Sequence, residues 1–259
     1  MYKRGNKKGQ VTLFIIIGIV IVAVVLLAIF LVPRISRPTT PQTSTLNPGA
    51  YISSCVTDEV LPILSKLSKQ GGYLDPSPYY TWYGNNLQFL CYSENETDDC
   101  VNQKPMLKED IENQLLVKVD SITRSCINSF KLQTENKGDI VTTCGTLLLG
   151  VALKPESVTI DITCPIKIVT KEDENLNFND FDISIDSNLY GQVMLAKDVV
   201  NEEIVGNGVN FAIQYASTHD DILLNSRTPT LGIRVYNITY INDPSDNEFL
   251  FAIKNPKYV

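Results

Sequence analysis

An unbroken apolar run, VTLFIIIGIVIVAVVLLAIFLV, occupies residues 11–32 and contains no charged side chain. As a helix rising about 1.5 Å per residue the run would be ~33 Å long, whereas the hydrocarbon core of a bilayer is about 30 Å thick. Soluble proteins seldom bury so long a stretch that has no polar face. The run therefore predicts a single transmembrane helix, with the lipid bilayer as its partner.

The charges beside the run predict its orientation. Four basic residues precede it, Lys3, Arg4, Lys7 and Lys8, and two follow it at positions 34 and 37. Because basic flanks stay in the cytoplasm, residues 1–10 should be cytoplasmic and the chain after residue 32 should lie outside the plasma membrane. The whole chain has a net charge of −7, and this acidity disfavours nucleic acid as a partner.

The cysteines are consistent with export. All six follow the apolar run, at Cys55, Cys91, Cys100, Cys126, Cys144 and Cys164. An even number of cysteines outside the cytosol indicates disulfides. A zinc site is disfavoured, because the chain has no Cys-x-x-Cys pair and only one histidine.

Patterns around the cysteines favour one of the fifteen pairings that six cysteines allow. Cys55 and Cys126 each fall on the apolar stripe of a predicted helix, so they would meet if those helices pack face to face. Cys91 and Cys100 enclose the short acidic segment YSENETDD. The pair that remains, Cys144–Cys164, would join two strands.

The residues after the run predict a stalk and one α+β domain. Residues 33–48 form a Ser/Thr/Pro-rich stalk, and residues 49–259 form a disulfide-linked extracellular domain. The part at about 49–130 should be helical, with helices near 51–70 and 105–130; Pro62 should kink or split the first. The part at about 139–259 should be rich in β-strands, with one helix at about 186–206. The expected fold class is thus α+β, with a mainly antiparallel sheet and packed helices.

Strand positions follow from alternation and from apolar runs. The segment 158–168, VTIDITCPIKI, alternates apolar and polar residues over its whole length. Segments 146–153, 231–241 and 248–253 should be its partner strands.

One segment, GGYLDPSPYYTWYGNN at 71–86, is unusually aromatic. Tyr79, Tyr80, Trp82 and Tyr83 are candidates for a contact surface that recognises glycans or proteins. The alternative is that most of these rings pack over the helix pair, as aromatic side chains usually do.

Signals for catalysis and for metal binding are weak. His219 has acidic neighbours, but no Gly-x-Ser-x-Gly motif accompanies it. The acidic segments 171–175 and 242–248 offer oxygen ligands for calcium, yet neither matches an EF-hand loop and both suit turns between strands. We therefore expect no enzyme activity, no cofactor and no metal.

Two Asn-x-Ser/Thr sequons occur, at Asn95 and Asn237. Asn95 lies in the segment between Cys91 and Cys100 and should be exposed, which makes it the better candidate for glycosylation. Asn237 falls in a predicted strand, so a glycan would fit there only on a solvated face.

The N-terminal stretch KKGQVTLFIIIGIV resembles the class III signal of archaeal type IV pilin-like proteins. The resemblance implies cleavage after Gly9, Gln10 as the new N-terminus, and retention of the apolar helix. Phe14 stands at the fifth position after the cut, where many pilins carry the Glu that helps subunits assemble.

The outer domain resembles a group of membrane-anchored surface proteins from DPANN archaea. The likeness rests on YISSCV, KQGGYL, LCYSENETDDCVNQKPMLKEDIENQL, CINSF and FLFAIKN, and it spans most of residues 50–254. It supports the topology and the cysteine pairing and implies no activity.

These observations together predict a non-enzymatic, membrane-anchored cell-surface protein for adhesion, cell contact or envelope structure. Its partners would be other surface proteins, glycans or copies of itself. One alternative is a pilin-like filament subunit processed after Gly9. The least favoured alternative is an exported hydrolase that uses His219.

Overall fold

The computed structural model describes residues 47–241 and 248–258. The chain divides into two compact units, Met1–Thr45 and Leu46–Val259, and every described residue belongs to the second unit. Residues 1–10, the apolar run at 11–32, most of the predicted stalk, Gly9 and Gln10 lie outside the described residues. Within 47–241 and 248–258, none of the helices is both long enough and apolar enough to cross a membrane.

Helix α2 (Pro48–Lys69) begins at a side-chain cap. The Asn47 Oδ1 atom accepts hydrogen bonds from the backbone N–H groups of Gly49 (3.0 Å) and Ala50 (3.4 Å), and proline at the first helical position leaves no N–H unpaired. Pro62 does not split the helix, which was one of the two outcomes expected: α2 is one helical segment through that residue. The ring of Pro62 lies on the exposed side of the helix.

Helix α3 (Leu107–Glu135) packs against α2. The two helices face each other with apolar stripes, and the stripe residues include Ile52, Val56, Leu115, Val119 and Phe130, all 1% exposed or less. The disulfide Cys55–Cys126 joins the two stripes. Cys91–Cys100 and Cys144–Cys164 form the other two disulfides, so the structure joins the same three pairs that the sequence favoured.

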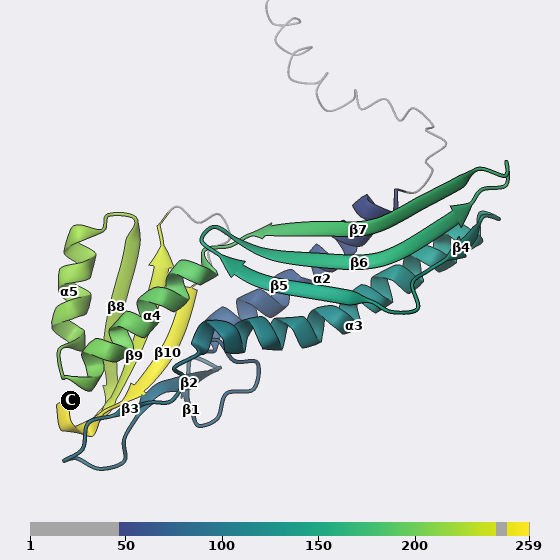
Figure 1. Ribbon diagram of the computed structural model, residues 1–259. Helices are drawn as coiled ribbons and strands as arrows, with labels where there is room; N and C mark the ends of the chain where they lie inside the picture. The colour runs from purple at the N-terminus through teal and green to yellow at the C-terminus, as the bar shows by residue number, and fades with distance from the viewer. Residues whose placement is uncertain (1–46, 242–247, 259) are drawn as a thin grey trace, which may run out of the picture. The chain divides into compact units, whose positions relative to one another are not determined.

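An antiparallel sheet lies along this helix pair (Figure 1). Its central strand β6 (Ser157–Val169) pairs with β7 (Asn175–Asp186) on one side, and with β4 (Ile140–Thr142) and β5 (Leu148–Lys154) on the other. The predicted alternation of β6 is confirmed, because every second side chain from Val158 to Ile168 is buried. On the opposite face of β6, the side chains of Asp161, Thr163 and Lys167 are exposed.

The second sheet has the strand order β1-β2-β10-β9-β8, and β3 pairs with β2. Its strands are β1 (Tyr79–Trp82), β2 (Asn85–Tyr92), β3 (Val101–Asn102), β8 (Ile222–Thr230), β9 (Ile233–Tyr240) and β10 (Glu248–Lys254). Only β2 and β10 pair in parallel among the described strands. The α+β class with mainly antiparallel sheets is thereby confirmed. Of the three segments predicted to partner residues 158–168, only 146–153 does so, as β5; segments 231–241 and 248–253 form β9 and β10 of the second sheet.

Two helices pack with this sheet, α4 (Leu189–Ile204) and α5 (Gly208–Thr218) (Figure 1). The sequence predicted a single helix here, because Gly206 is a helix end and residues 206–208 resembled a C-cap. Gly206 does have the left-handed conformation of such a cap (φ 75°), but a second helix starts two residues later. Three strands, β1–β3, also lie within the part at 49–130 that was expected to be helical.

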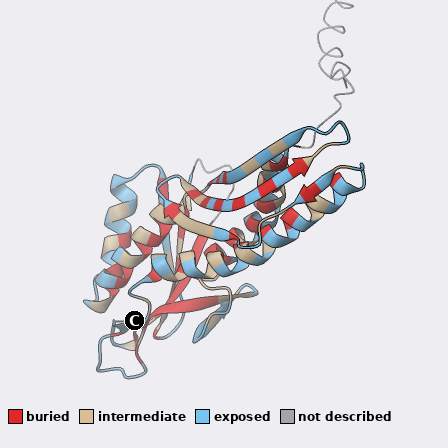
Figure 2. Ribbon diagram, turned by 45° about the vertical axis from the view of Figure 1, so that its right-hand side comes forward, coloured by how far each residue is buried: buried red, intermediate tan, exposed pale blue. Residues whose placement is uncertain are grey.

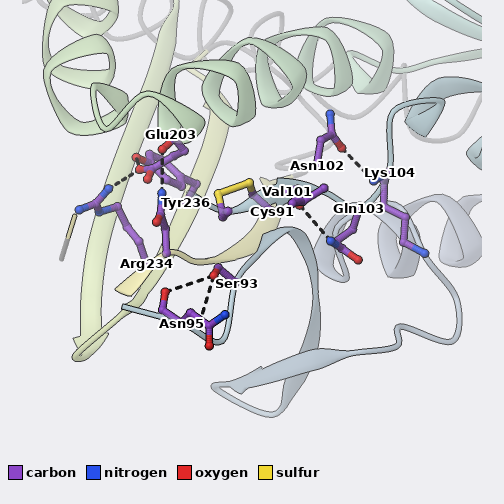
Figure 3. Close-up of a disulfide and its surroundings, with 12 residues drawn as sticks. Cys91, Ser93, Asn95, Val101, Asn102, Gln103, Lys104, Glu203, Arg234 and Tyr236 are labelled. Atoms are coloured by element: carbon purple, nitrogen blue, oxygen red, sulfur yellow. Dashed lines mark hydrogen bonds and ion pairs between the residues drawn. A yellow bond between two sulfur atoms is a disulfide. The ribbon is translucent and has the colours of Figure 1, made fainter. Parts of the chain in front are cut away.

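A polar cluster is buried under α4 (Figure 3). The fully buried carboxylate of Glu203 accepts hydrogen bonds from the Arg234 guanidinium and the Tyr236 hydroxyl, and the Asn255 amide donates to the Glu203 carbonyl (2.8 Å). The chain ends just beyond, in a 3₁₀ turn at Pro256–Tyr258. The cluster ties the end of α4 to β9 and to the C-terminal residues. In Figure 2, buried residues are frequent in the strands of the second sheet, while most of α5 is intermediate or exposed.

Candidate functional site

The face of the second sheet that points away from α4 carries the candidate site. Strand side chains alternate between faces, and on β9 the residues Arg234, Tyr236 and Ile238 point into the main core. Val235 belongs instead to a separate, small apolar cluster with Leu87, Phe89, Leu250 and Ala252. This cluster is packed by rings from β1 and β2, so the β1–β2 hairpin covers one part of this face.

The hairpin turns at two residues that both have positive φ angles. Trp82 pairs with Asn85, and between them lie Tyr83 (φ 44°) and Gly84 (φ 83°), the backbone pattern of a type I′ turn. Glycine adopts this conformation freely, but tyrosine does so at a cost of about 1–2 kcal/mol. The Tyr83 side chain is 88% exposed, so burial does not offset that strain. Strained, exposed residues concentrate at binding sites.

A groove of about 470 Å³ separates the hairpin tip from strands β8–β10. Trp82, Tyr83 and Asn85 line it from the hairpin, and the other lining residues are Asn225, Arg227, Val235, Asn237, Glu248 and Leu250. Cross-strand pairing places three of these in one row, because Asn225 is opposite Asn237 and Asn237 is opposite Leu250. The volume is in the range of small-molecule sites.

Some polar groups of the groove bond to one another and others do not. The Asn237 amide donates to Glu248 Oε2 (2.7 Å), and the Thr239 hydroxyl donates to Asn237 Oδ1 (2.9 Å). The side chains of Asn85, Asn225 and Arg227 make no hydrogen bond or ion pair with any other residue of 47–241 and 248–258. Three polar side chains at the groove are therefore available to a ligand.

The groove is also nearly neutral. Arg227 and Glu248 are the only charged residues among its lining residues. Opposite charges at one site favour an uncharged or zwitterionic ligand over a polyanion.

Gln88 holds the aromatic strand in place. Its side chain is fully buried, and Oε1 accepts from the Ser77 N–H (2.9 Å) while Nε2 donates to the carbonyls of Ser77 (3.3 Å), Pro78 (3.1 Å) and Phe89 (3.1 Å). Because residues 77–78 lead directly into β1, these bonds fix where the hairpin begins.

Side chains of α3 hold the preceding loop. The Tyr73 hydroxyl donates to the Asp110 carboxylate, and the Leu74 N–H donates to Gln114 Oε1 (3.0 Å). Burial, with the Asp110 hydrogen bond second, raises the pKa of Tyr73. The hydroxyl therefore stays protonated, and keeps this bond, at alkaline pH values where an unperturbed tyrosine would ionise.

The structure separates the four aromatic residues that the sequence singled out. Trp82 and Tyr83 line the groove, with their rings in an edge-to-face arrangement 4.6 Å apart. Tyr80 packs against the small apolar cluster beside Trp82. Tyr79 has the opposite orientation on β1 and is 52% exposed.

The sequence did not identify the residues that β8 and β10 contribute. Asn225, Arg227 and Glu248 are polar positions on strands, far from the aromatic segment along the chain. Residues 222–227, ILLNSR, do not alternate between apolar and polar side chains, so the sequence carried no signal for the face on which Asn225 and Arg227 lie.

The two sequons lie in different surroundings. Asn95 is exposed in the loop closed by Cys91–Cys100, where its backbone N–H contacts the Ser93 hydroxyl (Figure 3) and its amide donates to Asp98 Oδ2 (2.7 Å). Asn237 is half-buried at the groove. A glycan on Asn237 would occupy the groove.

The remaining candidates lie away from this groove. His219 follows the end of α5, where its ring stacks on Tyr215 at 3.9 Å and Nδ1 contacts the Tyr215 carbonyl. Residues 171–174 form the β6–β7 turn, and Asp173 takes a positive φ of 61° there. Residues 242–247 of the second acidic segment lie outside the described residues. In the described part of the chain, no three or more His, Cys, Asp or Glu side chains are grouped to hold a metal ion.

Comparisons of this chain with protein-family models, with curated proteins and with solved structures found no match.

Proposed function

We propose that the protein is a non-enzymatic cell-surface protein that contacts other molecules of the cell envelope through the groove between the β1–β2 hairpin and β8–β10. The observation that carries this proposal is the exposed, strained Tyr83 beside Trp82, opposite polar side chains that have no partner among the described residues. At Tyr83 the strained backbone conformation costs free energy, and the aromatic ring that it holds is exposed to solvent. Such a cost is expected where the ring contacts a ligand.

The proposed location is the outer side of the plasma membrane, with residues 11–32 as a single membrane-spanning anchor and the N-terminus in the cytoplasm. Three disulfides support an oxidising compartment, since such bonds seldom persist in the cytosol. Trypsin applied to intact cells should digest residues 47–259, and the chain should stay with the membrane fraction after a carbonate wash. Protection of the domain in intact cells would contradict this topology.

Processing at the N-terminus is a separate proposal. Mass spectrometry of the native protein should show either a chain that begins at Gln10 or one that retains residues 1–9. A retained segment eliminates the pilin-like alternative, and cleavage after Gly9 would require a search for filaments.

The contact function is tested with isolated cell envelopes. The full chain should sediment with envelopes of its source cells, and Trp82→Ala should reduce the bound fraction severalfold. Tyr79→Ala is the matched control, because Tyr79 lies on the same strand but faces away from the groove. Equal binding by both variants, or no binding by the unaltered chain, would refute the proposed contact site.

A further inference from the structure

We propose that the ligand of this groove is a saccharide of low net charge, with a sugar ring placed against Trp82 and Tyr83. This inference rests on the proposed function and names the class of ligand. It is argued from the chemistry of the lining residues.

The aromatic wall suits a sugar ring. A pyranose has faces of aliphatic C–H groups and an edge of hydroxyl groups, so it needs an apolar plane on one side and polar groups around it. The face of one of the two rings supplies that plane, and the other ring stands edge-to-face beside it, so Trp82 and Tyr83 form a corner against which a sugar ring can pack. Both side chains are amphipathic and keep a polar atom that can face water.

The polar side of the groove suits hydroxyl groups. Each sugar hydroxyl is both a donor and an acceptor, and it pairs best with groups that offer both or with a donor beside an acceptor. The amides of Asn85 and Asn225 each offer an NH₂ and a carbonyl oxygen, and the Arg227 guanidinium offers further donors. Asn237 and Glu248 already bond to each other and form a fixed donor–acceptor edge.

The same features disfavour a peptide or a polyanion. A protein partner needs an exposed apolar centre, but the apolar floor residues Val235 and Leu250 are only 4% and 5% exposed. Strand addition would use the backbone along the outer edge of β8, the last strand of this sheet, whereas the groove is lined by side chains on the face of β8, β9 and β10. A polyanion needs several cations, and the groove contributes one, balanced by Glu248.

Trp82 allows a direct test, because it is the only tryptophan in the chain. The full chain is held in a detergent without a sugar headgroup and titrated with methyl α-mannoside, methyl β-galactoside, methyl β-glucoside and N-acetylglucosamine. At least one should give a saturable change in Trp82 emission, with Kd of about 1–10 mM as expected for a shallow site. Sorbitol and tetraglycine serve as non-binding probes.

Two variants with matched controls assign the response to the groove. Asn225→Ala and Arg227→Ala should each weaken the saccharide response at least tenfold. Asn210→Ala on α5 and Arg124→Ala on α3 make the same chemical changes at exposed positions elsewhere and should leave it unchanged. Thermal unfolding of all four variants verifies that they are folded.

Several outcomes would overturn the saccharide proposal. These are no saturable response to any sugar up to about 100 mM, a response that sorbitol or tetraglycine reproduces, or a sugar response that survives both groove variants. If Trp82→Ala abolishes envelope binding while every sugar fails, the contact function stands and the saccharide class is refuted. If a sugar binds to the groove while the chain does not bind to envelopes, the saccharide class stands and the contact function is refuted.

Discussion

Replacing Tyr83 by asparagine should stabilise the domain while it removes the contact surface. Tyr83 has φ 44°, and the left-handed region costs a residue of this kind about 1–2 kcal/mol. Asparagine tolerates that region much better and is a preferred residue of type I′ turns. The variant loses the ring contact with Trp82, which is worth about 0.5 kcal/mol at so exposed a site. The expected net gain is therefore about 0.5–1.5 kcal/mol, or roughly 1–6 °C in Tm.

The assay is thermal and urea unfolding of the full chain, followed by envelope binding at a temperature where both forms are folded. Tyr79→Asn is the control: Tyr79 has extended strand geometry in β1, so the same change should destabilise by a few tenths of a kcal/mol and leave binding intact. A lower Tm for Tyr83→Asn would refute the argument from backbone strain, and full envelope binding by this variant would refute the role of Tyr83 in the contact.

Three further predictions concern stability. Gln88→Leu should cost about 2–4 kcal/mol in urea unfolding, because it leaves buried groups at residues 77–78 without partners; a loss below 0.5 kcal/mol would show that the hairpin is held otherwise. Replacing both cysteines of a disulfide by serine should lower the free energy of unfolding by an amount that grows with the length of the closed loop. The expected loss is about 4 kcal/mol for Cys55–Cys126, separated by 71 residues, and about 2.5 kcal/mol for Cys91–Cys100, separated by 9. The opposite order would refute the entropic account. Burial, with the Glu203 charge second, raises the pKa of Tyr236, so above about pH 10 this tyrosine ionises only in the unfolded state, and the free energy of unfolding should fall as pH rises past that value. Tyr236→Phe should make the free energy of unfolding depend less steeply on pH above about pH 10. An unchanged dependence would contradict the assignment.

Regular patterns made much of the fold predictable. The alternation of β6 and the stripes of α2 and α3 each report burial on one side, and burial on one side leaves a period in the sequence. The Cys55–Cys126 pairing followed from the same stripes, because a face-to-face helix pair brings the two sulfurs together. In each case the local pattern and the tertiary structure agree.

Strand β2 escaped prediction because it lacks such a period. Strand β2 has five consecutive buried residues, Leu87–Cys91, because both of its faces are covered, so no alternation appears in NNLQFLCY. Helix α5 escaped prediction for another reason: its cap residue Asn207 is a usual start signal, but Gly208 follows it and the preceding Gly206 marks a helix end. Gly206 was therefore interpreted as the end of the only helix in that region.

Only the aromatic side of the groove could be predicted from the sequence. The aromatic segment was visible as a local excess of rings, but its partners come from β8–β10, more than 130 residues later in the chain. Strand order decides which polar faces meet those rings, and no local signal fixes that order. The sequence thus indicated the aromatic half of the candidate site and could not indicate the amide and charged groups that line its other half.

Hydrogen–deuterium exchange of the full chain, with and without isolated envelopes, tests the central claim most directly. The account predicts slower exchange in peptides that cover 79–86, 223–228 and 235–239, with no change in 157–186 or 208–218. Protection confined to the exposed face of β6–β7 or to α5 would place the contact elsewhere and contradict the account.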